Sequence, residues 1–160
     1  MITQDQLKEL LKYNPETGLF YWQKSSRWTT IHSVAGTTKD TYVKIRINGK
    51  NYYAHRLAWL YTYGIWPKGD IDHKNRDKKD NRLVNLREAT RSQNKYNVGL
   101  TLANNSGHKG VQWVGCRQKW RVDCRVGGVQ YYLGLFSTVK EANKVYNEFA
   151  KRHHGEFFAK

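Results

Sequence analysis

The amino-acid sequence predicts an α+β protein built from two small modules, each combining antiparallel strands with helices. Apolar and polar residues alternate over 42–54, which is typical of strands, and Asn48-Gly49 favours a tight hairpin turn between them. Apolar residues at helical spacing over 139–152 predict a helix near the C-terminus. The uncharged segment 99–107 shows little periodicity and indicates a linker between the modules.

The net charge favours a nucleic-acid partner. The chain of 160 residues carries 28 Lys and Arg against 13 Asp and Glu, a formal charge of +15 at pH 7. Clustered cations neutralise phosphates and release counterions, so an excess of this size indicates a polyanion as partner. The excess is spread over residues 1–98 and 108–160, which we interpret as the two modules. Aromatic residues form 14% of the chain, which argues against disorder.

Other classes of protein are disfavoured by what the sequence lacks. No apolar stretch is long enough to cross a bilayer, so we expect no membrane partner. The N-terminus lacks the basic and apolar regions of a signal peptide. Cys116 and Cys124 form no disulfide framework and match no zinc-site spacing. We therefore expect a soluble protein of a reducing compartment, the cytoplasm.

The first module opens with a short helix. Thr3 and Gln6 form a capping-box pattern ahead of leucines at helical spacing, the last of which is Leu11. The sequence Asn-Pro-Glu-Thr-Gly at 14–18 predicts a turn, and residues 19–23 predict a strand.

The hairpin over 42–54 is expected to have one apolar and one basic face. Its apolar side chains alternate with polar ones: Val43, Ile45 and Ile47 against Tyr42, Lys44 and Arg46. Helical spacing of apolar residues then begins at Leu57, and Gly64 is expected to cap the C-terminus of that helix.

The second module is predicted to contain three strands and a helix. Two sets of side chains point to opposite sides of its middle strand: Trp120, Val122 and Cys124 against Arg121, Asp123 and Arg125. The helix carries an apolar stripe: Ala142, Val145, Tyr146, Phe149 and Ala150. This stripe should pack on the apolar side of the sheet, which leaves the polar side for solvent or a ligand. The same alternation predicts that Trp113 and Trp120 belong to the core.

Residues 70–94 contain the side chains best suited to catalysis. Asp72 and His73 lie on a short predicted strand, a basic loop follows, and a return strand leads to a helix that Thr90 and Gln93 open with a second capping box. Neighbouring residues of a strand point to opposite faces, so the Asp and His should flank a bound phosphate group. Each residue alone is typical of a solvated surface or a capped turn, but their order and spacing favour a catalytic site.

This spacing resembles that of HNH endonucleases. Asn85 follows His73 by twelve residues, Asn94 follows nine residues later, and Asp72 directly precedes His73. The similarity is to the phage and intron-encoded HNH homing endonucleases and covers residues 13–97. It implies a ββα-metal fold, also called the His-Me finger, for the first module.

The resemblance implies a role for each matching position. His73 would be the general base that takes a proton from the attacking water. Asp72 and Asn94 would hold one divalent cation, Mg²⁺ or another such as Mn²⁺, and Asn85 would orient the histidine through the loop. Many relatives have His where this chain has Asn94, which leaves the metal preference open. For His55, packing and a contact with the substrate are equally compatible with the sequence.

The second module is similar to another family. Lys-Trp-Arg-Val at 119–122 and Tyr-Leu-Gly-Leu-Phe at 132–136 resemble the apetala/ethylene-response-factor DNA-binding domain, with similarity over 106–158. In that family a three-stranded sheet lies in the major groove. The DNA-contacting residues that the resemblance implies, and that strand alternation selects almost in full, are Lys109, Gln112, Arg117, Arg121, Arg125, Gln130 and Tyr132. Gln112 and Gln130 replace Arg residues common in plant members, so their DNA target cannot be transferred.

These features predict a metal-dependent, site-directed DNA endonuclease of homing type that hydrolyses phosphodiester bonds of double-stranded DNA. We expect a monomer rather than a homodimer, which nicks one strand and, if phage-encoded, acts in the host cytoplasm. Two alternatives stay open. One is a DNA-binding regulator with an inactive nuclease centre, and the other is an RNA-binding or RNA-cleaving protein.

Overall fold

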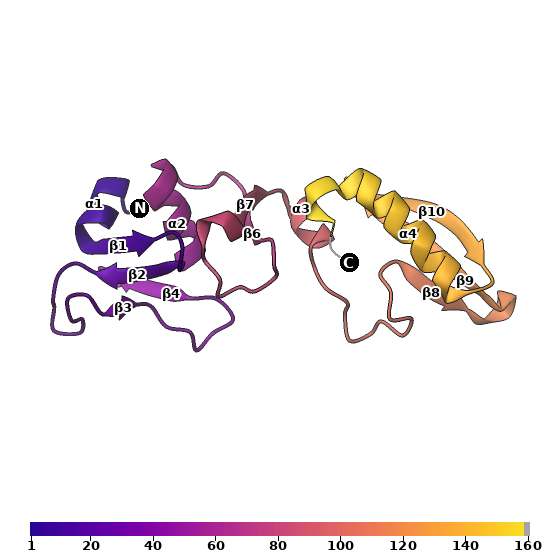
Figure 1. Cartoon of the computed structure of the whole chain (residues 1–160), viewed down its shortest axis with the longest axis horizontal. Coiled ribbons are helices and arrows are strands. Elements are labelled where there is room, and N and C mark those ends of the chain that lie inside the picture. Colours follow the sequence, from indigo (N-terminus) through magenta and orange to yellow (C-terminus); the bar gives the residue numbers. More distant parts are fainter. Residues whose placement is uncertain (159–160) are drawn as a thin grey trace. The chain divides into compact units, whose positions relative to one another are not determined.

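The computed structural model describes residues 1–158 and divides into two compact units, Met1–Ala89 and the residues from Thr90 onward (Figure 1). The division falls before the predicted linker, so the short helix that follows Ala89 belongs to the second unit. Both units combine helices with small antiparallel sheets, as predicted. No helix within residues 1–158 has the length and apolar character needed to cross a membrane.

The first unit contains a three-stranded sheet, two hairpins and two helices. In chain order its elements are α1 (Gln4–Leu10), β1 (Leu11–Asn14), β2 (Leu19–Trp22), β3 (Val34–Ala35), β4 (Lys44–Ile47), β5 (Lys50–Tyr53), α2 (Ala54–Tyr63), β6 (Asp70–His73), a 3₁₀ turn (Leu83–Asn85) and β7 (Leu86–Ala89). The sheet has the order β1-β2-β3, while β4 pairs with β5 and β6 with β7, all antiparallel.

Helix α1 begins as predicted but ends earlier. Thr3 Oγ1 accepts from the backbone N–H of Gln6, and Gln6 Oε1 accepts from that of Thr3, which confirms the capping box. Leu11 leaves the helix and adopts an extended conformation with φ −134°, since it starts β1, which pairs with β2. Its side chain is fully buried. Strands β1 and β3 were not predicted, because the leucine spacing favours a helix up to Leu11 and β3 has only two residues.

The hairpin β4–β5 confirms the interpretation of Asn48-Gly49. Both residues have positive φ, 48° and 80°, as a two-residue turn of type I′ requires. Ile45 and Ile47 are buried, whereas Lys44 and Arg46 lie on the opposite face. Helix α2 ends at a Gly64 in the left-handed conformation, as predicted.

The core of the first unit joins α1, the sheet, the first hairpin and α2. Its largest fully buried side chains are Leu7, Leu11, Phe20, Ile45, Leu57 and Leu60. Ile71 of β6 and Leu86 of β7 belong to the same cluster, so the hairpin that carries Asp72 and His73 rests on this core.

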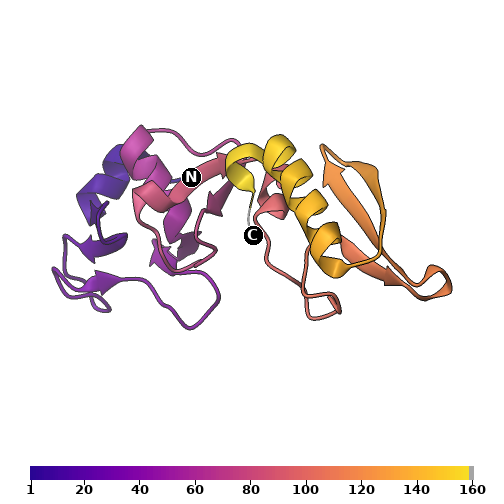
Figure 2. The same cartoon turned by 45° about the vertical axis from the view of Figure 1, so that its right-hand side comes forward.

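The second unit has the three strands and the helix that the sequence predicts. Its elements are α3 (Arg91–Tyr96), β8 (Val111–Val114), a 3₁₀ turn (Gly115–Arg117), β9 (Lys119–Val126), β10 (Val129–Phe136), α4 (Val139–His154) and a 3₁₀ turn (Gly155–Phe157). The strand order is β10-β9-β8, and α4 covers one face of this sheet (Figure 2). The buried core consists of Val111, Val122, Cys124, Ala142, Tyr146 and Ala150.

Trp113 departs from the prediction that it belongs to the core. The register places it opposite Trp120, on the α4 side of the sheet, and the two ring centroids are 5.0 Å apart. Trp120 packs partly buried against the core, but Trp113 keeps 48% of its surface exposed. The prediction was wrong because alternation gives the face of the sheet and not how far the helix covers it. Here segment 101–106 lines a pocket with both rings.

Candidate active site

Asp72 and His73 end β6 and are both buried, with 5% and 4% of their surface exposed. The antiparallel register places Arg87 of β7 opposite Asp72. Asp72 Oδ2 accepts hydrogen bonds from Arg87 Nε at 2.9 Å and from Nη2 at 2.7 Å. The predicted metal ligand is therefore oriented by an arginine that sequence reasoning missed, because the pairing depends on a register set across a loop.

His73 is held in the chemical form that a general base needs. Asn81 Nδ2 donates to Lys79 O at 3.1 Å, which turns Asn81 Oδ1 toward His73 Nε2, 3.3 Å away. An amide oxygen only accepts, so the proton lies on Nε2 and Nδ1 carries the lone pair. Burial lowers the pKa of His73, against the opposing effects of Asn81 and the nearby carboxylates. The ring is consequently neutral at neutral pH.

The loop between β6 and β7 is closed by Asn85. Its Oδ1 accepts from Asn75 N at 3.0 Å, and its Nδ2 donates to Asp80 O at 2.8 Å. Lys74 N also donates to Asn85 O, at 2.9 Å. These bonds fix the chain directly after His73, which is the geometry that the predicted orienting role requires. The role itself stays a prediction.

The same loop is anchored to the N-terminal sheet. Tyr13 Oη donates to Asn81 O at 2.7 Å across 68 residues of sequence. Gly18 has φ +73°, and a Cβ at this position would overlap the backbone of Asn81 and Arg82. The Arg82 guanidinium beside Asp80 lowers the pKa of that carboxyl to about 2. The basic loop after β6 thus has an ordered end at Asn81, next to His73.

His55 packs against His73. The ring centroids are 5.1 Å apart in an edge-to-face arrangement. Burial lowers the pKa of His55 to about 3, and its Nδ1 has no hydrogen-bond partner among residues 1–158. Tyr42 and Tyr53 enclose the His55 ring at centroid distances of 5.3 and 5.5 Å. His55 is thus a neutral, buried side chain whose ring packs against that of His73, the candidate base.

Asn94 lies on α3 in the second unit. The capping box of Thr90 and Gln93 that opens this helix is confirmed, with both reciprocal hydrogen bonds present. Tyr96, the last residue of the helix, accepts at its hydroxyl from Gly127 N at 2.7 Å. The helix that carries Asn94 is therefore fastened to the turn between β9 and β10.

Two further contacts hold Tyr96 in place. Its ring stacks on His154 at 3.7 Å and 4°, and burial lowers the pKa of this histidine. Its carbonyl accepts from Lys109 Nζ at 2.8 Å. Lys109, which was predicted to contact DNA, lies before β8 and turns toward α3. Its contact with DNA stays a prediction.

The other residues predicted to contact DNA are exposed: Gln112, Arg117, Arg121, Arg125, Gln130 and Tyr132. The register pairs Gln112 with Arg121 and Gln130 with Arg125, so these four side chains share the face opposite α4. Asp123 also lies on this face and binds the Arg121 guanidinium at 2.6 and 2.9 Å. The face is basic, but this carboxylate offsets one of its charges.

Among the described residues, no group of three His, Cys, Asp or Glu side chains is arranged to hold a metal ion. The donors that the HNH resemblance implies are of another composition, one Asp carboxylate and one Asn amide oxygen. Both are oxygen ligands, which fit a hard divalent cation such as Mg²⁺.

A known family matches the segment of the chain that carries these residues. The model of a family described as HNH endonuclease matches residues 52–96, which contain β5, α2, β6, β7 and α3. The chain therefore carries an HNH endonuclease domain, which supports a DNA nuclease.

A phage protein is similar to this chain over a longer stretch than the family model. Protein 3.8 of Escherichia phage T7 is 30% identical over 104 residues, which make up 64% of this chain and 85% of that protein. The chain belongs to the same family as this phage protein. No solved structure matches the chain. The HNH family model ends at residue 96, so the resemblance of 106–158 to the apetala/ethylene-response-factor domain stays a prediction.

Proposed function

We propose that the protein is a metal-dependent, site-directed DNA endonuclease of homing type that nicks double-stranded DNA. The observation that carries this proposal is the buried His73 at the end of β6, with its Nε2 3.3 Å from Asn81 Oδ1, inside an HNH endonuclease domain. The elements β6, β7 and α3 follow one another in the order of a ββα-metal fold.

The proposed reaction is hydrolysis of one phosphodiester bond. Nδ1 of His73 takes a proton from a water molecule, and the water oxygen attacks phosphorus as the bond to the 3′ oxygen breaks. The leaving 3′ oxygen takes up a proton from solvent, so the products are a 5′-phosphate and a 3′-hydroxyl. A base with a lowered pKa is deprotonated at neutral pH and needs no prior activation.

Asp72 and Asn94 are the residues that would hold a divalent cation, Mg²⁺ or Mn²⁺. When bound, such an ion stabilises the negative charge that develops on the phosphate and on the leaving oxygen. Arg87 orients the Asp72 carboxylate through Oδ2. Asn85 holds the loop that follows His73.

The second module, residues 108–160, would recognise the DNA through the exposed face of its sheet. Arg121 and Arg125 can pair with guanine, and Gln112 and Gln130 with adenine. The basic and amide side chains on one face, opposite a supporting helix, support a domain of the apetala/ethylene-response-factor type. In this proposal residues 99–107 link it to the nuclease module, residues 1–98.

A monomer with one such centre cuts one strand, so double-strand breaks would need a homodimer or two successive events. The relative from a phage supports a phage-encoded enzyme that acts in the cytoplasm of the host.

Nicking of supercoiled plasmid tests the proposal. Wild type and His73→Ala are incubated with Mg²⁺ or with EDTA, on plasmids that carry candidate sites. We expect Mg²⁺-dependent conversion to open circles by the wild type alone. Conversion by the variant would refute His73 as the base, and firm binding of duplex DNA without conversion would indicate a regulator with an inactive centre.

A further inference from the structure

A structured turn of the first unit displays an exposed tryptophan. Ser26 N donates to Thr29 O at 2.9 Å, and Trp28 N donates to Ser26 Oγ at 3.2 Å. The hydroxyls of Ser26 and Thr29 lie 2.7 Å apart. These bonds place Arg27 and Trp28 at the tip of the turn. Trp28 keeps 85% of its surface exposed, and the Arg27 guanidinium lies 5.2 Å from the centroid of its ring.

This tryptophan makes no contribution to the core. Large aromatic side chains are mostly buried in folded proteins, and an exposed one beside cations is typical of a surface that binds a partner. The hydrogen bonds of the turn position the ring without covering it, so the arrangement presents Trp28 to solvent.

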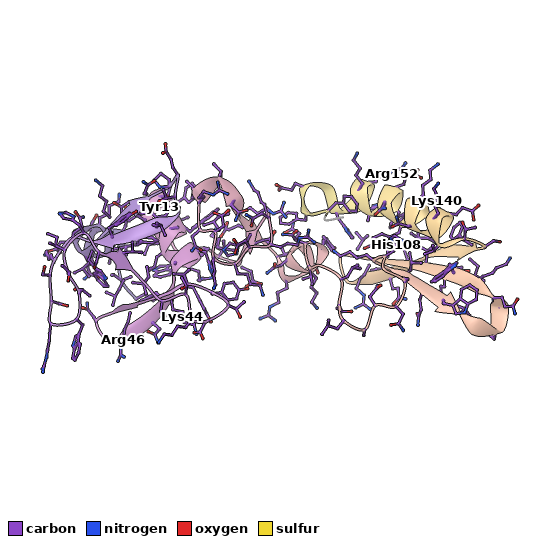
Figure 3. All side chains as sticks on the ribbon, turned by 60° about the horizontal axis from the view of Figure 1, so that its bottom comes forward. Tyr13, Lys44, Arg46, His108, Lys140 and Arg152 are labelled. Carbon is purple, nitrogen blue, oxygen red and sulfur yellow. The ribbon has the colours of Figure 1, made fainter. Side chains whose placement is uncertain are left out.

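Ser26, Trp28 and Thr29 of this turn line a pocket of about 1050 Å³ in the first unit. Lys44 and Arg46, from the basic face of the β4–β5 hairpin, also line this pocket. Figure 3 shows both side chains on the same side of the first unit. Lys44 forms an exposed ion pair with Asp40 at 2.7 Å. The pocket thus combines cations with an aromatic ring.

Aromatic contacts connect this pocket to the candidate base. Lys44 Nζ lies 5.8 Å from the ring centroid of Tyr53, its cross-strand partner, and 41% of the Tyr53 surface is exposed. The Tyr53 ring stacks on His55 at 5.5 Å and 14°, and His55 contacts His73. A continuous series of basic and aromatic side chains therefore leads from the pocket to His73 within one unit.

We propose that this pocket is a DNA-binding site of the nuclease unit, which receives the duplex beside the phosphate that is attacked by the water molecule His73 deprotonates. Arg46 and Lys44 contact the phosphate backbone, and Trp28 packs against a deoxyribose. The site rests on the proposed nuclease function and is distinct from the sheet of the second unit. Contacts with phosphate and sugar position a duplex without reading its bases, so this site serves placement rather than sequence recognition.

The test measures DNA binding without cleavage. Full-length wild type, Arg46→Ala and Trp28→Ala are titrated into a fluorescein-labelled duplex in EDTA, and anisotropy is recorded between about 50 and 200 mM salt. Arg46→Ala should lower the slope of log Kd against log salt by about one, since one phosphate contact is lost. Trp28→Ala should weaken binding about fivefold at every salt concentration, because it removes an apolar contact and no phosphate contact.

Two variants serve as matched controls in the same unit. Lys12→Ala removes an exposed cation of β1 outside the pocket, and Tyr63→Ala removes an exposed aromatic ring of α2. Both should retain the wild-type affinity and salt slope. Thermal melting followed by circular dichroism verifies that each variant is folded.

The outcomes separate the two proposals. If the wild type binds the duplex and both pocket variants bind it with unchanged affinity and slope, the pocket is not a DNA site and the nuclease proposal stands. If the wild type does not bind duplex DNA, both proposals are overturned. The pocket proposal is also refuted if Lys12→Ala and Tyr63→Ala lose as much affinity for DNA as the pocket variants do.

Discussion

Replacing Asn81 by Ala tests how His73 is prepared for catalysis. Asn81 is 2% exposed, and its side chain makes two contacts, with His73 Nε2 at 3.3 Å and with Lys79 O at 3.1 Å. The bond from Tyr13 Oη goes to the backbone carbonyl of Asn81 and is retained in the variant. The substitution therefore removes the hydrogen-bond partner of His73 Nε2 and keeps the bond from Tyr13 that anchors the loop.

The expected effects follow from these two contacts. Each buried hydrogen bond contributes about 1 kcal/mol, so Asn81→Ala should lose about 2 kcal/mol of unfolding free energy. In a unit of this size that lowers the melting temperature by roughly 8–16 °C. Without its acceptor the His73 ring loses its fixed tautomer and orientation, and partners of this kind typically contribute about 10- to 100-fold to activity. The nicking rate should fall by that factor with Kd for DNA unchanged.

The pH dependence separates orientation from general loss of structure. The hydrogen bond to Asn81 raises the pKa of His73, so its removal lowers that pKa further. A general base must be deprotonated, hence the rate falls as pH drops through its pKa. The acid limb of the rate profile should therefore lie at lower pH in Asn81→Ala than in the wild type.

Single-turnover nicking of plasmid in saturating Mg²⁺, over pH 5–8 and well below the melting temperature of the variant, provides the measurement. Asn14→Ala is the matched control. It also removes a side chain with two hydrogen bonds in the first unit, to Glu16 N and Thr17 N, but it does not contact His73. It should lower stability and leave the acid limb in place. An Asn81→Ala protein with the wild-type rate and an unmoved acid limb would refute the reasoning.

Three further predictions concern stability and binding. Burial lowers the pKa of His55 to about 3 in the folded protein, so between pH 7.5 and 5 only the unfolded state gains a proton at this residue. The free energy of unfolding should therefore fall by about 2 kcal/mol over this range. His55→Phe should show less of this pH dependence in thermal melts. Gly18→Ala should be more destabilising in urea than Gly49→Ala, since both have positive φ but only the first Cβ meets neighbouring backbone. Arg121→Ala combined with Arg125→Ala should weaken binding of the target site and leave residual nonspecific nicking. Full site selectivity in that double variant would show that the sheet of the second unit does not recognise the target sequence.

Local signals made several elements predictable from the sequence. The capping boxes at Thr3 and Thr90 and the Asn48-Gly49 turn depend only on residues a few positions apart, so their chemistry is readable without the fold. Leu11 was assigned to a helix because it continues the spacing of the preceding leucines. Its extended conformation comes from pairing with Trp22, which no local pattern announces.

For the candidate site, too, the sequence predicted only what local patterns show. The order of Asp72, His73 and Asn85 could be recognised as a motif, but the side chains that prepare them could not. Arg87 reaches Asp72 only because a twelve-residue loop sets the β6–β7 register. Asn81 contacts His73 only because that loop folds back, and the backbone carbonyl of Asn81 accepts a hydrogen bond from Tyr13 of β1. Tertiary contacts of this kind depend on the whole unit.

Helix α3 depends on such contacts more than any other element near the site. It has six residues and no buried side chain, and helices this short are unstable in isolation. Besides its capping box, the contacts of Tyr96 hold it: the hydroxyl bond with Gly127, the bond from Lys109 and the stack on His154. The order of Asn94 should therefore depend on a residue that takes no part in the chemistry.

Two substitutions of Tyr96 measure this dependence. Tyr96→Phe removes the bond to Gly127 N, about 1 kcal/mol, and keeps the ring stack, so protection of the Asn94 amide against hydrogen exchange should fall about fivefold. Tyr96→Ala also removes the stack on His154, worth about a further 0.5–1.5 kcal/mol, and should release the helix. If Asn94 is a metal ligand, the Mg²⁺ concentration for half-maximal nicking rises in the same order, whereas His73→Ala abolishes nicking at every Mg²⁺ concentration. Unchanged amide protection in Tyr96→Ala would mean that the capping box alone keeps α3 folded.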